Sequence, residues 1–379
     1  MRWLLILLLV CRAHAQETYR FREDISQAVA RDTMPWRLQM AATAYSLSGH
    51  YPEGLQQWDL AMPANFALSK KDSFALKSMR AVSAREAILK LSAQRQIVII
   101  NEAHHDARHR NFTRSLLQGL RRQGFETLAL EALADTLINI RGFAIKESGY
   151  YTQEPQFGNL IHEAHRLGFR IVGYEAPAGV NGKDREIAQA ANLKKILDRY
   201  PGKLLIHCGY DHVIEGVPNN PSWERAMAGR LKDLLGIDPL TIDQVRYSAR
   251  GSTERSHPFS HASAAGDSWT LKEPGGNYWS ASPDQYDLTV VHPHSMDVEG
   301  RPHWMLTGRR EHNPKIDRRH ASLILAYREG EYQKAGIPTD IVEHTATGGP
   351  NLYLLPGAYE IMIFDQTYRI VKQYKTTLP

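Results

Sequence analysis

The sequence predicts an α/β protein with a mainly parallel sheet, flanking helices, a helical N-terminal segment and a β-rich C-terminal part. Between residues 97 and 245, short apolar runs alternate with amphipathic stretches, a pattern typical of βαβ units. Four of these runs end at a chemically reactive side chain, and in open α/β sheets ligands bind outside the carboxyl ends of the strands. Residues 286–379 instead contain several strand-like runs that are separated by turn residues.

Residues 1–15 have the features of a secretory signal peptide. A positive start precedes the apolar run Trp3–Val10, and Ala13-His14-Ala15 is a small-residue cleavage motif. We expect cleavage after Ala15 and a periplasmic or secreted mature protein. A lipoprotein attached through Cys11 is the less favoured alternative, because the preceding Val10 is larger than the small residue usually found there.

The composition excludes several classes of protein. Of the 379 residues, 42% are hydrophobic and 23% are charged, which are ordinary values for a folded globular protein. The formal net charge is +5, but no block of Lys and Arg with interleaved aromatic residues occurs, so we expect no nucleic-acid partner. No apolar stretch after the leader approaches the ~20 residues of a transmembrane helix. Cys208 is the one cysteine of the expected mature chain, so no internal disulfide can form.

Residues 16–95 are predicted to form a helical N-terminal segment. Leu38–Tyr45 and Gly54–Trp58 flank a turn at Gly49–Pro52, and this pattern resembles one helical hairpin of the tetratricopeptide kind. Such repeats need several stacked copies, so a single copy predicts only a helical lead-in packed on the main domain. Ser83 is a suitable N-cap for a further helix.

Residues 96–250 are predicted to form the α/β core. Its strands are short apolar runs, as expected of buried parallel strands, and its helices carry apolar residues on one face and stop near Gly or Pro. The predicted strands are Ile97–Ile100, Thr127–Leu130, Phe169–Tyr174, Lys203–Ile206 and Pro239–Val245, and the predicted helices are Asn111–Gln123, Leu160–Leu167, Asp184–Tyr200 and Trp223–Leu235.

The remaining residues divide into two regions. Residues 251–285 are rich in Ser, Gly, His and Pro and contain few aliphatic residues, which predicts a long loop or lid. Residues 286–379 are predicted to be β-rich, and they either extend the sheet or form a small β-domain. Their predicted strands are Asp287–Val291, Ser322–Tyr327, Asn351–Leu355, Tyr359–Phe364 and Tyr368–Tyr374, with a hairpin turn at Pro356-Gly357.

The first core strand leads into a cluster of acid and histidine side chains. Glu102, His104, His105 and His109 occupy the turn after this strand and the start of the next helix. Glu102 is close enough to orient an imidazole or to act as a base itself, so the cluster suits general-base catalysis or metal binding. The alternative is a solvated, histidine-rich helix start, which the position at a strand end makes less favoured.

Acids follow the second and third core strands. Glu131 and Glu175 end these strands, and an acid there is rarely buried without a partner. Arg185 is the candidate partner, near the start of a helix that also carries Gln189 and Asn192 on related faces. The alternative is an ordinary capped surface helix.

The fourth core strand ends in a second histidine motif. Gly209 and His212 have the spacing G-x-x-H, and Gly209 would permit a tight turn that returns His212 to the top of the sheet. Cys208 is interpreted as a small buried apolar residue, because no cysteine-protease signature surrounds it.

Taken in order, these motifs resemble the superfamily that joins erythromycin esterases, ChaN-type haem-uptake lipoproteins and TraB/Tiki proteases, with an EreA/ChaN-like fold. Its members have a glycine-glutamate-x-histidine stretch after the first strand, an acid after the second and G-x-x-H after a later one. Here Asn101–His105, Glu131 and Gly209–His212 match in that order, within roughly residues 97–245. The helix that carries Arg185 is similar to the arginine-bearing helix of the esterase and haem-uptake branches.

Two departures leave the branch open. Asn101 stands where the superfamily has glycine, and Asn tolerates a left-handed backbone better than most residues. The doubled histidine also gives two registers. G-x-x-H spacing selects His104, as in the haem-uptake and Tiki branches, whereas E-x-x-H spacing selects His105, as in the esterases.

The resemblance implies a secreted or periplasmic hydrolase that activates water to cleave an ester or amide bond in a small-molecule or peptide substrate. His105 or His104 would activate the water with Glu102, and Arg185 would stabilise the oxyanion. The candidate residues are, for catalysis, Glu102, His105, Arg185 and Glu131, and, for one divalent metal ion of unknown identity, His104, Glu131 and His212. The alternatives are a haem- or metal-binding protein of the ChaN type and an inactive exported scaffold. The sequence indicates no oligomeric state.

Overall fold

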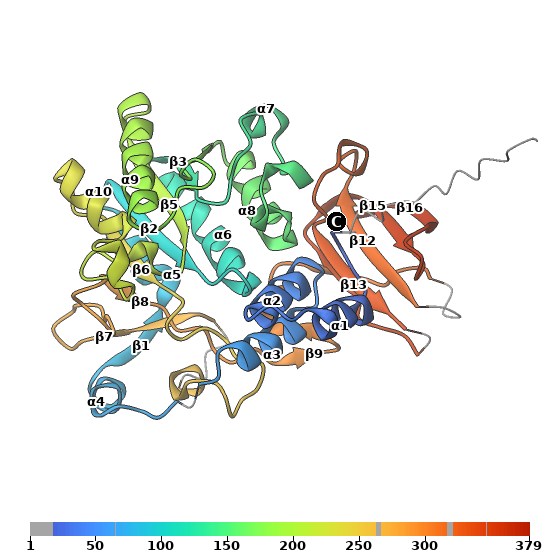
Figure 1. Cartoon of the computed structure of the whole chain (residues 1–379), viewed down its shortest axis with the longest axis horizontal. Coiled ribbons are helices and arrows are strands. Elements are labelled where there is room, and N and C mark those ends of the chain that lie inside the picture. The colour runs from blue at the N-terminus through green and yellow to red at the C-terminus, as the bar shows by residue number, and fades with distance from the viewer. Residues whose placement is uncertain (1–17, 65, 263–266, 317–320, 346) are drawn as a thin grey trace, which may run out of the picture.

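The computed structural model describes residues 18–379 except residues 65, 263–266, 317–320 and 346 (Figure 1). The predicted signal peptide and the alternative lipidation site Cys11 therefore lie outside the described residues. Within the described part of the chain, no helix is both long enough and apolar enough to cross a membrane.

A six-stranded sheet forms the centre of the α/β part, and all of its neighbouring strands run parallel. The strand order is β4-β3-β5-β2-β6-β8. The strands are β2 (Ile97–Glu102), β3 (Phe125–Leu130), β4 (Arg170–Gly173), β5 (Lys203–Gly209), β6 (Leu240–Asp243) and β8 (Leu288–Thr289). The predicted α/β fold with a mainly parallel sheet is confirmed.

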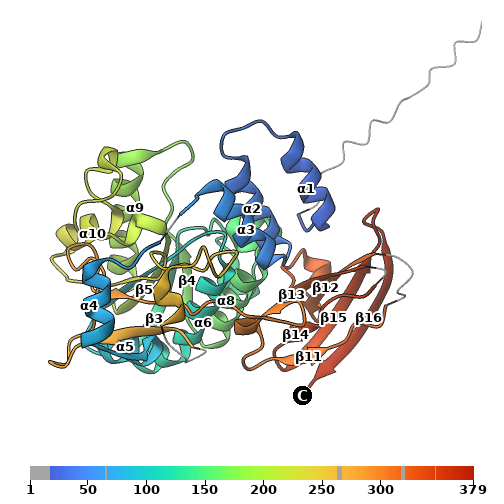
Figure 2. The same cartoon turned by 90° about the horizontal axis from the view of Figure 1, so that it is seen from below.

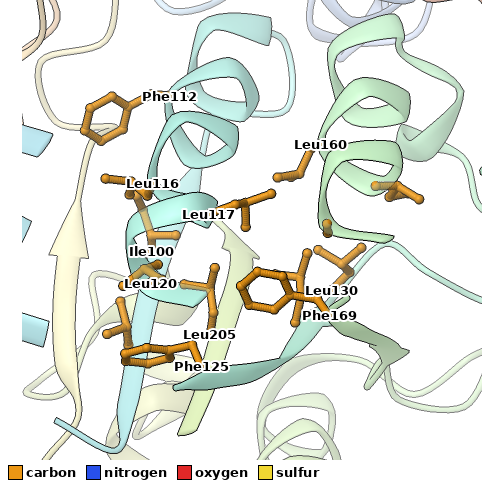
Figure 3. Packing of buried hydrophobic residues seen from close by; sticks show 14 of the residues in the cluster. Ile100, Phe112, Leu116, Leu117, Leu120, Phe125, Leu130, Leu160, Phe169 and Leu205 are labelled. Atoms are coloured by element: carbon orange, nitrogen blue, oxygen red, sulfur yellow. The ribbon is translucent and has the colours of Figure 1, made fainter. Parts of the chain in front are cut away.

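Helices cover both faces of this sheet, because apolar side chains of the strands point alternately to either side. Val98 and Ile100 of β2 pack on one face, and Ile97 and Ile99 pack on the other. The first face is covered by α5 (Ala84–Ser92), α6 (Ala107–Arg122), α7 (Ile138–Arg141) and α8 (Pro155–Arg166), and the second by α9 (Gly182–Arg199) and α10 (Met227–Leu235). Figure 3 shows the packing beneath α6 and α8. Burial on both sides explains the uninterrupted apolar runs in the sequence.

The N-terminal segment is mostly helical, as predicted, but a strand interrupts it. The elements are α1 (Arg22–Arg31), α2 (Arg37–Leu47), α3 (Tyr51–Ala61), α4 (Lys70–Ser78) and β1 (Arg80–Ser83). β1 pairs antiparallel with β7 (Trp269–Lys272), which belongs to the segment predicted as a loop or lid. Trp269 and Trp279 of that segment are buried in a shared core cluster. Aromatic residues thus supply the buried apolar area of this segment, and the scarcity of aliphatic residues led to its prediction as a loop or lid.

The C-terminal part is β-rich, as predicted, and most of it forms antiparallel sheet apart from the parallel one. Four strands pair in the order β13-β12-β15-β16, and two short pairs lie outside this sheet. The strands are β9 (Asp297–Val298), β10 (Arg301–Pro302), β11 (Arg310–His312), β12 (Ser322–Arg328), β13 (Asp340–His344), β14 (Leu352–Leu354), β15 (Gly357–Phe364) and β16 (Ile370–Leu378). The predicted hairpin at Pro356-Gly357 does not form, because β14 pairs with β11 while β15 pairs with β12 and β16.

Of the N-terminal helices, α1, α2 and α3 lie beside the junction of the α/β part and the C-terminal sheet, whereas α4 lies at the opposite end of the α/β part (Figures 1 and 2). Tyr19 and Phe21, which precede α1, pack on β12 and β13 of the C-terminal sheet. Tyr51, at the start of α3, donates a hydrogen bond to Glu154 before α8 of the core, at 2.9 Å. The helical segment is therefore packed on both the core and the C-terminal sheet.

Candidate active site

Glu102, at the end of β2, is buried and makes four hydrogen bonds to side chains. Its Oε1 lies 2.8 Å from both Arg110 Nη2 and His104 Nδ1, and its Oε2 lies 2.7 Å from Arg110 Nε and 2.8 Å from His207 Nε2. Burial raises the pKa of Glu102, but the charge of Arg110 and the bonds to the two histidines outweigh it and hold the pKa well below its usual range. Glu102 is thus a charged carboxylate that orients its partners.

His104 presents its second ring nitrogen at the edge of the sheet. In the neutral ring whose Nδ1–H donates to Glu102, Nε2 carries no proton and can accept one. The ring stacks on Tyr151, with the centroids 3.8 Å apart, and meets Tyr210 edge-on at 5.0 Å. The side chain of His104 is 16% exposed, whereas that of Glu102 is 2% exposed, so the imidazole is the solvent-facing member of the pair.

Gly209, at the end of β5, makes room for this imidazole. A Cβ atom on Gly209 would lie 2.5 Å from His104 Cε1, 2.7 Å from His104 Nε2 and 3.5 Å from Glu131 Oε2. The φ of Gly209 is −83°, an ordinary value, so the glycine serves this close approach and not the tight turn that the sequence suggested. The backbone N–H of Gly209 also donates to Glu131 Oε2 at 2.6 Å. The imidazole of His104 and the carboxylate of Glu131 therefore both lie beside Gly209.

The unusual backbone conformation falls on Tyr210, whose φ of 40° is rare for a bulky residue. Tyr210 opens the short helix η3 (Tyr210–Val213). Asn101 Nδ2 donates to Tyr210 O at 3.0 Å and to Asp243 Oδ1 at 2.8 Å, and Asn101 Oδ1 accepts from Gln244 N at 2.8 Å. Asn101 is thus a residue of β2 whose amide fastens η3 to β6, and no left-handed turn occurs at this position.

His105 lies in different surroundings from His104. It is 2% exposed, its ring stacks on Trp58 of α3 with centroids 4.0 Å apart, and its Nδ1 is 3.3 Å from the Tyr210 hydroxyl. Burial, followed by the charge of His109, lowers the pKa of His105 well below its usual range, so the ring is neutral. His109 is also buried, and its Nδ1 accepts from Ala103 N at 2.9 Å. Of the histidines in this turn, it is His104 that the structure brings to Glu102.

Glu131, at the end of β3, is joined to Glu175 through Arg185 of α9. Arg185 Nη2 is 2.5 Å from both Glu131 Oε1 and Glu175 Oε2, and Arg185 Nε donates to Glu175 Oε1 at 3.0 Å. Gln189 also donates to Glu175, at 2.9 Å. Burial raises the pKa of Glu131, but His212, His104 and Arg185 together outweigh it and lower the pKa. The predicted partnership of Arg185 with both acids is present.

His212 forms a second imidazole–carboxylate pair at the same edge. Its Nδ1 is 2.9 Å from Glu186 Oε2, its Nε2 is 2.8 Å from Arg185 Nη1 and 3.5 Å from Glu131 Oε1, and its ring stacks on Trp223. Burial lowers the pKa of His212, but Glu131 and Glu186 outweigh it and raise the pKa. The bond from Arg185 requires an unprotonated Nε2. Protonation would turn Nε2 into a donor towards Glu131 and end the hydrogen bond from Arg185 Nη1, while Arg185 keeps its bonds to Glu131 and Glu175.

The structure therefore brings Glu102, His104, Glu131, Arg185 and His212 to one edge of the sheet, and it adds three residues that the sequence analysis missed. These are Arg110, Glu186 and His207. Each could have been found as a polar residue on a buried apolar face. Arg110 precedes Leu117 by seven residues in α6, Glu186 precedes Leu193 by seven in α9, and His207 follows Leu205 by two in β5.

The three predicted metal ligands do not present an open ligand set in this arrangement. Glu131 Oε1 and His212 Nε2 both accept hydrogen bonds from Arg185, and Glu131 Oε2 accepts one from Gly209 N. A guanidinium thus stands where a divalent cation would need to bind. Across the described residues, no group of three or more His, Cys, Asp and Glu side chains is arranged to hold a metal ion.

No family model matches the chain, and no curated protein matches it. The structure of the type III effector HopBA1 is 12% identical over 47% of this chain and 94% of its own, with a TM-score of 0.32. RRSP, a MARTX toxin effector domain from Vibrio vulnificus, is 16% identical over 66% of this chain and 46% of its own, with a TM-score of 0.31. A structure described as "Bacterial protein toxins" is 14% identical over 67% of this chain and 50% of its own, with a TM-score of 0.33. This chain thus spans about half the length of the last two, and the likeness is too slight to carry an inference about function.

Proposed function

We propose that this protein is a hydrolase in which His104 activates water to cleave an ester or amide bond. The observation that carries the proposal is the pair formed by His104 and the buried, charged Glu102, with Nε2 of the imidazole near Glu131 at the solvent-facing edge of the sheet. A carboxylate in this position orients a catalytic histidine and stabilises its protonated form. The same pairing occurs a second time, between His212 and Glu186.

In the first step, His104 Nε2 takes a proton from water while the water oxygen attacks the carbonyl carbon of the substrate. The electron pair of the carbonyl π bond moves to its oxygen, and Glu102 stabilises the imidazolium that forms. In the second step, the electron pair on the oxyanion re-forms the carbonyl double bond, the bond to the alcohol or amine leaving group breaks, and the leaving group takes a proton from His212. A proton passing through solvent from His104 to His212 then restores both rings.

Arg185 is suited to stabilise the oxyanion. A guanidinium has five N–H donors. Three of them donate to Glu131 and Glu175 among the described residues, and a fourth reaches His212 only while His212 Nε2 is unprotonated. With His212 protonated, as the acid step requires, both N–H groups of Nη1 are left for the developing charge. The raised pKa of His212 favours its protonated form, which an acid for the leaving group needs.

A screen of p-nitrophenyl esters and peptide p-nitroanilides with the purified protein tests the proposal. We expect turnover in at least one series, a loss of about 10²–10⁴-fold in His104→Ala, and no loss when a chelator is added. His165→Ala is the matched control, because His165 is an exposed histidine of α8. This variant shows how much hydrolysis comes from a surface imidazole.

Two outcomes would overturn the proposal. The first is hydrolysis in His104→Ala at the rate of the His165→Ala control. The second is an absence of turnover together with a Soret band after mixing with haem, which would favour the ChaN-type alternative. Loss of activity with the chelator would show that a metal ion displaces Arg185 and carries the water.

A further inference from the structure

We propose that a hollow on the C-terminal sheet, away from the His104 site, binds a small amphipathic anion with a flat apolar body. This aromatic hollow is defined by Tyr19, Lys146, Tyr327, Tyr332, Tyr368 and Arg369, and its volume is about 760 Å³. Ligand pockets typically measure about 300–1,000 Å³ and are formed mainly by apolar and aromatic side chains around a few polar groups.

The hollow exists because one face of the C-terminal sheet is only partly covered. Along β12, the side chains of Ile324 and Ala326 point into a core that they share with β13, β14 and β15. Leu323, Leu325 and Tyr327 point to the opposite face, which Tyr19 and Phe21 cover in part. The hollow lies on this second face, where Leu323, Leu325 and Tyr327 of β12 are among its lining residues, so its floor is the sheet itself.

Five aromatic rings line the hollow: Tyr19, Tyr327, Tyr332, Phe364 and Tyr368. Two of them are held by hydrogen bonds through their hydroxyl groups. Tyr19 donates to Gln153 O at 3.1 Å, and Tyr368 donates to Asp24 Oδ2 at 2.5 Å. Walls fixed in this way are formed before a ligand arrives, which reduces the entropy lost on binding. Flat apolar ligands pack well on such aromatic rings.

The charges of the hollow select an anion. Lys146 and Arg369 contribute positive charge, and no Asp or Glu is among the lining residues. Lys146 is half-buried, and its ammonium group lies 5.9 Å from the centre of the Tyr19 ring. Arg369 interacts electrostatically with Asp365 of its own turn, whose Oδ1 accepts from Arg369 N at 3.1 Å, whereas the described residues give Lys146 no ion pair. A carboxylate or sulfonate on the ligand would supply the missing partner for Lys146.

Paired fluorescent probes test the proposal on the purified protein. 8-Anilinonaphthalene-1-sulfonate carries a flat body and one anion, and N-phenyl-1-naphthylamine has the same body without the charge. We expect saturable binding of the sulfonate at one site, about tenfold tighter than the neutral probe, because one charge-assisted contact is worth about this factor. Lys146→Gln should remove that difference and leave binding of the neutral probe unchanged.

Lys372→Gln is the matched control, because Lys372 is an exposed lysine of β16 that does not line the hollow. Near-ultraviolet circular dichroism of each variant reports whether its tertiary packing is intact, since both probes also bind partly unfolded chains. The proposal fails if the two probes bind equally, if Lys146→Gln and Lys372→Gln behave alike, or if sulfonate binding is not saturable. Arg369→Gln, a substitution at an exposed position, repeats the test without touching a half-buried residue.

Discussion

Side-chain direction separates His104 from His105, although the two are adjacent in the sequence. The His104 ring is bonded to Glu102 and partly open to solvent, whereas the His105 ring is buried under Trp58. Consecutive residues in a turn point in different directions, so only one of two adjacent histidines can face a given partner. The two histidines are the same residue type, so the sequence leaves both registers open, and side-chain direction decides between them.

Substituting each histidine in turn should separate their roles. His104→Ala should lower kcat by about 10²–10⁴-fold, because the ring acts on the substrate. It should also cost some stability, because the stacking on Tyr151 and the bond to Glu102 are lost. His105→Ala should leave kcat within a few-fold and lower the free energy of unfolding by about 0.5–1.5 kcal/mol or more, because stacking on Trp58 is lost. Ester hydrolysis and urea denaturation measure both effects. A His105→Ala protein that is stable but inactive would assign the role to His105 instead.

The pKa of His212 predicts the alkaline side of the pH–rate profile. Glu131 and Glu186 raise this pKa above 6.5, so the rate should fall as the pH rises through the raised value. Glu186→Gln removes one of the charges, and the alkaline limb of kcat/KM should move to lower pH. Glu224→Gln, an exposed substitution next to Trp223, should leave the limb in place. Identical profiles for the two variants would exclude His212 as the acid.

The same shift gives a stability effect of known sign. The folded pKa of His212 lies above its unfolded value of about 6.5, so protonation stabilises the fold fully below about pH 6.5 and this contribution is lost as the pH rises through the folded pKa.

At the scale of elements, the end of β5 matters more than any single side chain. Gly209 lets His104 approach the strand, Tyr210 turns the chain with a positive φ, and Asn101 of β2 holds that turn. The glycine of the motif G-x-x-H therefore marks the end of β5 and allows another element to pack closely against the strand.

Gly209→Ala should damage the site more than the fold. The added Cβ would lie 2.5 Å from His104 Cε1, so the imidazole must leave its place beside Glu102. We expect kcat/KM to fall by at least tenfold, while the melting temperature falls by only a few degrees, since the φ of −83° suits alanine. Gly202→Ala, in the turn before β5, is the control. Its added Cβ meets no neighbour within 4 Å, so this variant changes the backbone strain of a glycine position without crowding a side chain. Full activity in Gly209→Ala would mean that His104 does not need its present position.

A chain of buried polar groups links α3 to the site. Tyr51 donates to Glu154 Oε1 at 2.9 Å, Arg110 Nη1 donates to Glu154 Oε2 at 3.2 Å, and Arg110 in turn holds Glu102. Burial raises the pKa of Glu154, so the hydrogen bond from Tyr51 helps to keep this carboxylate charged. The helical N-terminal segment thus acts as a positioning element for Glu102.

Tyr51→Phe should test this link. It leaves a buried carboxylate oxygen without its donor, which costs about 1–3 kcal/mol of stability. It should also move the pH dependence of kcat, because Arg110 is then shared differently between Glu154 and Glu102. Tyr45→Phe in α2 is the control, since its hydroxyl makes a long 3.5 Å bond to Arg22 O and none to Glu154 or Arg110 among the described residues. Unchanged pH profiles in both variants would mean that Tyr51 contributes to packing and does not position Glu102.

At the scale of the molecule, the two sheets are held together through buried polar contacts. Arg309, which precedes β11, donates to Tyr353 O of β14 and to Gln156 of α8, and Asn159 of α8 donates to Thr339 O before β13. The core and the C-terminal sheet are therefore expected to unfold together.

Glu331 gives this cooperative unit a pH dependence. Burial raises the pKa of Glu331 to about 7 from 4.5, and Arg328 and Lys334 only partly oppose it. Because the folded pKa is above the unfolded one, the stabilising contribution is full below about pH 4.5 and is lost as the pH rises through about 7. Glu331→Gln should thus become more stable than the wild type at pH 8 by about 2–3 kcal/mol, less any screening by solvent. Urea denaturation at pH 5 and pH 8 measures the difference, and equal gains at both pH values would contradict the assignment.

Local patterns in the sequence were enough to predict the fold class, the order of the core elements and most of the candidate site. Strands buried on both faces must be apolar throughout, amphipathic helices must repeat with a period near 3.6, and reactive residues that end parallel strands must lie at one edge. These constraints are local, so Glu102, Glu131, Arg185 and His212 could be found without a structure. The strand β7 was missed because aromatic residues, and not an apolar run, bury it.

Three features of the site follow from long-range packing. These are which histidine faces Glu102, which residues lower the pKa of that carboxylate, and which group occupies the position proposed for a metal ion. Arg110 and His207 reach Glu102 from α6 and β5, and Arg185 reaches Glu131 from α9. Each of these contacts depends on the direction of a side chain and on the separation of two elements that are distant in the sequence. Local periodicity fixes neither quantity, because both follow from how the helices pack on the completed sheet.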